Sequence, residues 1–178
     1  MIFVALSAGL QLAFGWLLAD FLSGVLHWSE DRGGPGREHW PILGSQVFAP
    51  NIQHHSDPLA LTESGFVERN WTTWAAVAPI ALVLAWIFGL QLWIVSAATG
   101  GAMANEIHTW AHRKTMAPAW AQSLQQIGLI QSPKQHAVHH VPDFKRNYCI
   151  VTDYLNPTLE RLDFWRRLES LVPRSWFR

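Results

Sequence analysis

Long apolar runs without charge constrain this chain more than any other feature. The first covers residues 2–28 and contains a single charged side chain, Asp20. Two further runs, 71–88 and 90–105, are uncharged, and the second is expected to continue as a helix to residue 112. About 20 apolar residues suffice for a helix to cross a bilayer. The sequence therefore predicts an all-α integral membrane protein with about three to four transmembrane helices.

The remaining segments fit one membrane-embedded domain that covers residues 1–178. The first run lacks a basic N-terminal region and a cleavage site, so we interpret it as a retained span and not as a signal peptide. Residues 29–70 are polar and rich in Gly and Pro, which predicts loops with short helices at most. Residues 118–132 have the spacing of an amphipathic helix, and the sequence does not decide whether it lies on the membrane or crosses it.

The basic residues predict how the chain is oriented. All 13 Lys and Arg residues lie in 29–70 or after residue 112. With three spans, these segments share one side, which the positive-inside rule makes cytoplasmic. We expect the N-terminus outside and the C-terminus in the cytoplasm, in the inner membrane of a bacterium or the endoplasmic reticulum of a eukaryote. The formal net charge of +0 argues against nucleic acid as a partner.

Histidines are the candidate metal ligands on that side. Eight of the nine fall into short groups: His27, His54, His55, His108, His112, His136, His139 and His140. Only His39 stands apart, and a capping or packing role is expected for it. The single cysteine, Cys149, excludes a Cys-rich zinc site. Any metal in this chain must therefore be held by histidine and carboxylate.

The spacing of the histidines indicates more than one metal ion. His108 and His112 are four residues apart and share one helical face, whereas adjacent histidines point apart and can serve different ions. Zinc sites close with four ligands, so eight imidazoles are too many for one such ion. Two irons could use this number, although imidazole suits iron, zinc, copper and nickel alike.

Three polar residues are candidates for supporting this site. Asp31 lies four residues after His27, and Asn105 lies three residues before His108, so each could be a ligand or hydrogen-bond to one. Asp20 lies on the same helical face as His27, seven residues earlier. Its carboxylate could support a ligand or make a hydrogen bond between helices.

Taken together, these motifs resemble the lipid desaturase family, whose members include the Kua-type plasmanylethanolamine desaturases and the plant phosphatidylglycerol trans-3 desaturase. The similarity runs from about residue 19 to residue 169. It rests on Asp20-Phe21-x-Ser23-Gly24-x-x-His27-Trp28-x-x-Asp31, His54-His55-x-x-Pro58, Asn105-x-x-His108-x-Trp110-x-His112, His136-x-x-His139-His140, Tyr148 with Leu155-Asn156-Pro157, and Phe164-Trp165-Arg166-Arg167-Leu168-Glu169. Broader membrane desaturases have a second histidine where this chain has Asp31, and Glu106 replaces a neutral amide.

The resemblance implies a membrane di-iron enzyme that uses two iron ions and O2 to remove two hydrogens from a phospholipid alkyl or acyl chain. It favours the vinyl ether formation of a plasmanylethanolamine desaturase. A di-iron lipid or fatty-acid hydroxylase and a non-catalytic metal-binding membrane protein remain alternatives. The oligomeric state is not specified by the sequence.

The electrons are expected to come from a separate protein. The sequence shows no haem, flavin or dinucleotide motif, so the donor would be a ferredoxin or a cytochrome b5-like protein. Its docking surface would be the basic C-terminal segment with Arg161, Arg166, Arg167 and Arg174. Anchoring to anionic lipid headgroups explains these arginines equally well.

Overall fold

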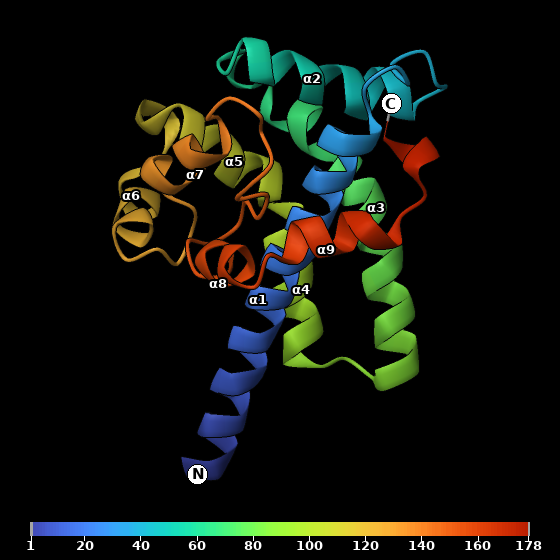
Figure 1. Ribbon diagram of the computed structural model, residues 1–178. Coiled ribbons are helices and arrows are strands. Elements are labelled where there is room, and N and C mark those ends of the chain that lie inside the picture. The colour runs from blue at the N-terminus through green and yellow to red at the C-terminus, as the bar shows by residue number, and fades with distance from the viewer. Residues whose placement is uncertain (1, 178) are drawn as a thin grey trace.

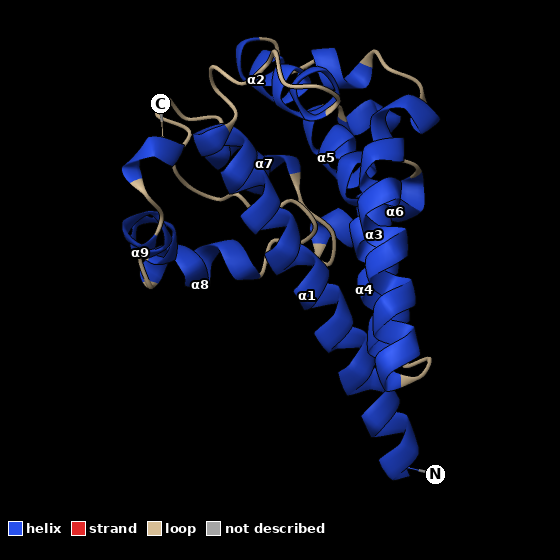
Figure 2. Ribbon diagram, turned by 90° about the vertical axis from the view of Figure 1, so that its right-hand side faces the viewer, coloured by secondary structure: helices blue, strands red, loops and turns tan. Residues whose placement is uncertain are grey.

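The computed structural model describes residues 2–177, and within that range every regular element is a helix (Figures 1 and 2). The longest helix, α1 (Ile2–Gly33), runs the height of the molecule. A hairpin of α3 (Phe66–Phe88) and α4 (Leu92–Ala102) lies beside it, with its turn toward the N-terminal end of α1 (Figure 1).

The shorter helices gather around the C-terminal half of α1 (Figure 1). Three of them lie near its C-terminal end: α2 (Ala49–Ser56), α5 (Ala104–His112) and α7 (Pro133–His139). Helix α6 (Ala119–Gln126) lies lower, where its Trp120 and Leu124 share a pocket with Ala13 of α1. Two more, α8 (Leu155–Arg161) and α9 (Phe164–Leu171), run across the middle of α1. Single π or 3-10 turns occupy Gly44–Phe48, Ala60–Thr62, Lys114–Met116 and Arg174–Trp176. The region 29–70 thus contains only short helices after the end of α1 and before the start of α3, as expected.

Two helices in the described range are long and apolar enough to cross a membrane, Leu6–Gly33 of α1 and Phe66–Phe88 of α3. The apolar window of α1 is 28% buried, and its Leu10 and Phe14 are 63% and 57% exposed. The apolar window of α3 is 0% buried, and Trp86 and Leu82 are 85% and 71% exposed. The outer faces of both helices are therefore without protein cover in the part of the chain that the structure describes.

The single helix expected over 90–112 is divided in two. Met103 separates α4 from α5, with φ −97° and ψ −2°. The break falls where the apolar run ends and the polar residues Asn105, Glu106 and His108 begin. These residues lie on α5, among the shorter helices. The 11 residues of α4 rise about 16 Å, roughly half of a bilayer core of about 30 Å. Length alone therefore qualifies two helices as spans, not three.

The helix expected over 118–132 is also shorter. Helix α6 has eight residues, and the chain turns back at Gly128, whose φ is +71°. Eight residues rise only about 12 Å, so α6 is too short to cross a bilayer by itself. Pro133 does not end this helix but begins the next one, α7, where Ser132 accepts a hydrogen bond from the Gln135 N–H.

Small residues let α1 and α4 approach closely. A Cβ added to Gly100 would stand 2.7 Å from the Cβ of Ala19. The Ser96 hydroxyl donates to the Leu12 carbonyl across the same interface, at 2.7 Å. Helix α4 is thereby packed along α1, and α5 continues from its end toward the histidines.

An extended segment, residues 148–152, packs across the face of α1 that carries Asp20, Ser23 and Gly24. A Cβ on Gly24 would lie 2.6 Å from Cys149 Sγ. Asp20 is fully buried and accepts hydrogen bonds from the N–H groups of Val151 and Thr152, both at 2.9 Å. The role of Asp20 is therefore to fix this segment, and the hydrogen bond runs from helix to extended chain, not between helices.

Candidate metal centre

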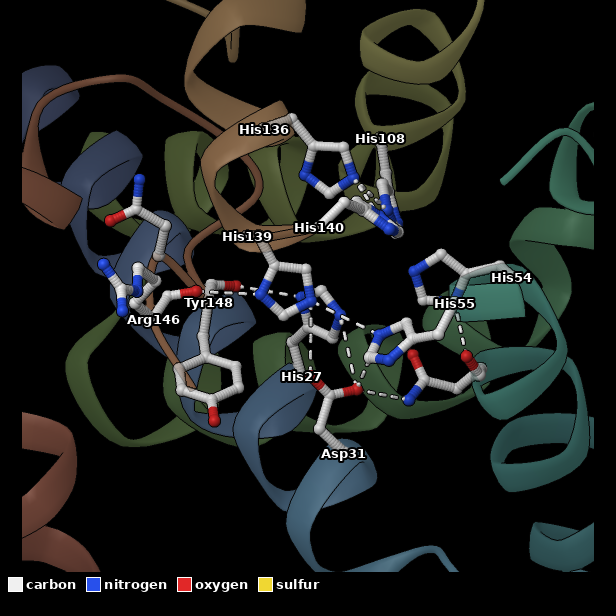
Figure 3. A network of polar contacts seen from close by, with 12 residues as sticks. His27, Asp31, His54, His55, His108, His136, His139, His140, Arg146 and Tyr148 are labelled. Atoms are coloured by element: carbon white, nitrogen blue, oxygen red, sulfur yellow. Dashed lines mark hydrogen bonds and ion pairs between the residues drawn. The ribbon is translucent and has the colours of Figure 1, made fainter. Parts of the chain in front are cut away.

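Eight histidines converge on one buried region although they come from four helices. All of them except His112 are labelled in Figure 3. His27 lies on α1, His54 and His55 on α2, and His108 and His112 on α5. His136 and His139 lie on α7, and His140 is its C-terminal cap. His39 is exposed and belongs to neither metal-capable group. The structure therefore brings together all eight sequence candidates and leaves the ninth histidine outside.

The cluster divides into two groups that share one residue. The first histidine group is His54, His108, His112, His136 and His140, and the second is His27, His54, His55 and His139. Within each group the candidate ligand atoms lie within 4.8 Å of one another. Adjacent residues His139 and His140 fall in different groups, and His54 belongs to both. Two ions side by side are the occupancy that this division fits.

In the first histidine group, four Nε2 atoms lie close together. His136 Nε2 is 3.0 Å from His108 Nε2, 2.9 Å from His112 Nε2 and 3.0 Å from His140 Nε2. His108 and His112, one turn apart on α5, are separated by 3.1 Å. The helical spacing of four thus produces a pair of nitrogens that face one point.

In the second histidine group a carboxylate takes part. Asp31 Oδ1 lies 3.2 Å from His55 Nε2 and 3.6 Å from His27 Nε2, while Oδ2 lies 3.3 Å from His139 Nε2 (Figure 3). The Asp31 side chain is only 3% exposed. Asp31 therefore stands among the candidate ligand atoms, in the position where broader membrane desaturases have a second histidine.

Backbone carbonyls orient three of the rings. His27 Nδ1 lies 3.1 Å from the Tyr148 carbonyl oxygen. His139 Nδ1 lies 2.8 Å from the Arg146 carbonyl oxygen, and His54 Nδ1 contacts the Asn51 carbonyl oxygen. A carbonyl only accepts, so each Nδ1 carries the proton and each Nε2 keeps a free lone pair. Such bonds are the usual support of metal-binding histidines.

These lone pairs are the test of whether a metal fits. His27 Nε2 and His54 Nε2 are buried and have no hydrogen-bond partner, which is costly without a ligand. Metal–nitrogen bonds of about 2.1 Å at right angles place two nitrogens about 3.0 Å apart, close to the spacing in the first histidine group. The donor set is imidazole and carboxylate, which suits a first-row transition metal. The residues present therefore fit a pair of such ions.

Burial keeps the histidines in the form that binds metal. Desolvation is the main cause that lowers the pKa of His54 and His136 well below the usual value, and it lowers the pKa of His140 to about 3. Neighbouring imidazoles lower the pKa further because charged rings would repel one another. These three rings are therefore neutral at physiological pH and offer lone pairs to a cation.

Asn51 is a supporting residue that the sequence analysis missed. Its Nδ2 donates to Asp31 Oδ1 at 2.6 Å, and its carbonyl orients His54. Its position three residues before His54 was a usable signal, because residues three apart share a helical face. The carbonyls of Arg146 and Tyr148 had no such signal, since any residue type supplies a carbonyl.

Asn105 and Glu106 connect α5 to α3 and do not join the histidines. Asn105 Nδ2 donates to the Arg69 carbonyl at 2.6 Å. Arg69 also forms a buried, two-point ion pair with Glu106, with Nε–Oε2 2.7 Å and Nη2–Oε1 3.0 Å. The expectation that Asn105 supports a metal ligand is replaced by this bracing role. The Glu106 charge is balanced by Arg69 next to it.

An apolar pocket of about 520 Å³ opens beside α5. Ile107 and Trp110 of α5 line it, and these residues flank His108 in the sequence. Further walls come from α1, α4 and α6, including Ala13, Ser96 and Leu124. This size lies within the range of about 300–1,000 Å³ that is usual for ligand pockets. Helix α5 therefore carries metal-facing histidines and part of an apolar wall.

Fold and site together define a helical protein with a buried histidine cluster that could hold metal, next to uncovered apolar helices. Comparison with known proteins places it further. Residues 16–176 match the model of the lipid desaturase domain, so the chain belongs to the lipid desaturase family.

Three relatives illustrate this membership. The chain is 35% identical to plasmanylethanolamine desaturase 1 of Mus musculus over 89% of its own length and 62% of the relative's. It is 33% identical to plasmanylethanolamine desaturase of Myxococcus xanthus, over 89% of its own length and 58% of the relative's. It is 32% identical to a probable fatty acid desaturase of Acanthamoeba polyphaga mimivirus, over 97% of its own length and 86% of the relative's. The chain thus spans about six-tenths of the first two relatives. No solved structure matches it.

Proposed function

We propose that this protein is a membrane-embedded di-iron lipid desaturase that removes two hydrogens from a phospholipid chain, most closely in the manner of a plasmanylethanolamine desaturase. The observation that carries the proposal is the pair of histidine groups joined at His54, in a chain of the lipid desaturase family. The names of two relatives support vinyl ether formation, and a third name supports an acyl substrate. The activity needs O2, two electrons from an external donor, and a lipid.

Each part of the centre has a task in this reaction. The eight histidines and Asp31 would hold two irons, which supply the oxidising power drawn from O2 when bound. The carbonyls of Asn51, Arg146 and Tyr148 keep three rings turned inward. Burial excludes water, which protects a reactive oxidant from side reactions. Asp31 contributes the negative charge that offsets part of the charge of two cations.

Metal and product analysis tests the proposal. Purified protein should contain close to two irons per chain. With a reductant, O2 and an alkyl-ether phospholipid, the product should have lost two hydrogens, as mass spectrometry would show. A product that gains one oxygen would identify a hydroxylase instead. One zinc without iron, or no oxygen consumption with ether and acyl lipids alike, would leave a metal-binding membrane protein.

The apolar pocket is the site that we assign to the lipid chain. Its lining is almost entirely hydrocarbon, and two lining residues lie on the helix that carries His108 and His112. Ala13→Phe should fill part of the pocket and lower conversion of long chains about tenfold relative to short ones, because chain fit is worth a few kcal/mol at most. Ala78→Phe on the exposed face of α3 is the matched control. Equal chain-length profiles in both variants would place the chain elsewhere.

The uncovered faces of α1 and α3 support membrane crossing by these helices, with α4 returning the chain to the histidine end. Since the Lys and Arg residues lie beyond the apolar runs, that end would face the cytoplasm. A reporter fused after Arg178 should then read the cytoplasm, and a tag at Met1 should be accessible from outside. The reverse result at both ends would overturn the orientation.

A further inference from the structure

The loop of residues 141–147, called here the 141–147 loop, covers the second histidine group in an unusual backbone conformation. Asp143, Phe144 and Asn147 have φ values of 103°, 49° and 56°. A bulky residue such as phenylalanine rarely adopts positive φ, and its surroundings must hold it there. The Arg146 carbonyl accepts a hydrogen bond from His139 Nδ1 at 2.8 Å, and the Asn147 N–H donates to Glu160 Oε1 at 2.8 Å. The loop is thus fixed directly to a candidate metal ligand.

This conformation places the Phe144 ring over His55. The two rings stack with centroids 4.4 Å apart and an interplanar angle of 27°. Phe144 also meets His140 at 6.1 Å, and it is half-buried. The Phe144 ring therefore covers one face of His55, a partly buried histidine whose Nε2 lies among the candidate ligand atoms.

Exposed basic residues lie next to Phe144 in the sequence. Lys145 and Arg146 follow Phe144 directly and are both exposed. Asn147 Nδ2 lies 3.4 Å from the Gln135 carbonyl, which brings the loop next to exposed Lys134. Asp143 is the one carboxylate within the loop itself. The local surface is basic although the whole chain has a formal net charge of +0.

We propose that the 141–147 loop is the docking surface for an acidic one-electron carrier protein, and that electrons enter the metal centre through Phe144 and His55. The proposal rests on the proposed function. One turnover combines O2, two protons, two electrons and two hydrogen atoms of the lipid to form two waters and a double bond. Two carrier molecules are oxidised in succession, each giving one electron to the metal centre. Complementary charge brings the carrier to the surface, and the stacked rings give a short contact path.

The basic helix α9, where the sequence pointed, is the less direct surface. Arg166 and Arg167 are exposed on it, but its buried Trp165 reaches His139 only through a further buried ring, Tyr148. Exposed Leu162 and Leu171 flank the arginines. Apolar and basic side chains side by side are typical of a helix that lies on lipid headgroups. These arginines therefore serve as the matched control.

The docking test compares two charge reversals, K145E/R146E and R166E/R167E, in full-length, metal-loaded protein. The probe is a plant-type ferredoxin, with a soluble cytochrome b5 domain as the second carrier, and affinity is titrated at low and high salt without lipid. K145E/R146E should weaken binding about tenfold at low salt and flatten the salt dependence, whereas R166E/R167E should bind like the parent protein. Loss confined to R166E/R167E, or equal loss in both, would overturn the proposal. So would a K145E/R146E protein that binds the carriers normally and loses only its affinity for phosphatidylglycerol vesicles.

The relay test uses Phe144→Leu, which keeps an apolar cover, beside Phe144→Ala. At saturating carrier, both variants should oxidise the carrier about tenfold more slowly with unchanged carrier affinity and metal content. Reduction by dithionite should proceed at the parent rate. Carrier oxidation at the parent rate in Phe144→Leu would exclude the relay. Because carrier binding is measured without lipid, a protein that binds carriers at the loop yet forms no lipid product would contradict the proposed function alone.

Discussion

Replacing His139 with alanine is expected to abolish lipid product and to remove one of two metal ions. His139 is fully buried, and its Nε2 lies 3.3 Å from both His55 Nε2 and Asp31 Oδ2. The change deletes a ligand of the second histidine group and leaves the Arg146 carbonyl without its donor. The first histidine group keeps all five of its members, so the metal content should fall from two toward one per chain.

His39→Ala is the control for this experiment. His39 is exposed and belongs to neither group, so its removal should change stability by no more than about 0.5 kcal/mol and leave product and metal unchanged. Metal per chain and lipid product would be measured at matched protein amounts. Two metals retained in His139→Ala, or an equal loss in His39→Ala, would contradict the assignment of the second histidine group.

The sequence predicted the candidate site better than the course of the chain around it. Histidines are rarely clustered by chance in a mostly apolar chain, and their spacing on helices is fixed by geometry. His108 and His112, four residues apart, do face one point, and His139 and His140, adjacent in sequence, do fall in different groups. What spacing could not show is which group each residue joins. That depends on how α1, α2, α5 and α7 meet, and hence on His54 standing between the two groups.

The errors in the fold share one cause. The helix boundaries were read from hydrophobicity, which does not record where the chain bends. In a continuous helix over 90–112, the turn that carries Asn105 and Glu106 would continue along the axis of α4. The break at Met103 instead turns them toward Arg69 on α3, where both find partners. Likewise, Gly128 ends the 118–132 helix early, and the chain that follows pairs Gln131 with Val151 through backbone groups. Tertiary hydrogen bonds decided both boundaries.

Asp20 shows how a polar residue in an apolar helix can support a distant site. Its carboxylate accepts three hydrogen bonds from the 148–152 segment, two from backbone N–H groups and one from the Thr152 hydroxyl at 2.5 Å. The same segment supplies the Tyr148 carbonyl that orients His27, seven residues further along α1. The two contacts together fasten one extended segment along one face of the helix. Removing Asp20 should therefore affect both folding and metal binding.

Asp20→Ala is expected to destabilise the protein by about 3–9 kcal/mol, because two backbone N–H groups and a hydroxyl remain buried without acceptors, at about 1–3 kcal/mol each. That loss is a large part of a typical folding free energy of about 5–15 kcal/mol. Asp20→Asn should retain most of the stability, because its amide oxygen still accepts from the Val151 and Thr152 N–H groups. Glu63→Ala, which removes an exposed carboxylate, should melt like the parent protein. Melting in detergent and metal retention during dialysis would be compared for all three variants. If Asp20→Ala melted with the parent and kept both metals, the 148–152 segment would be held by packing around Cys149 and Trp165, and the carboxylate would not be what positions the His27 ring.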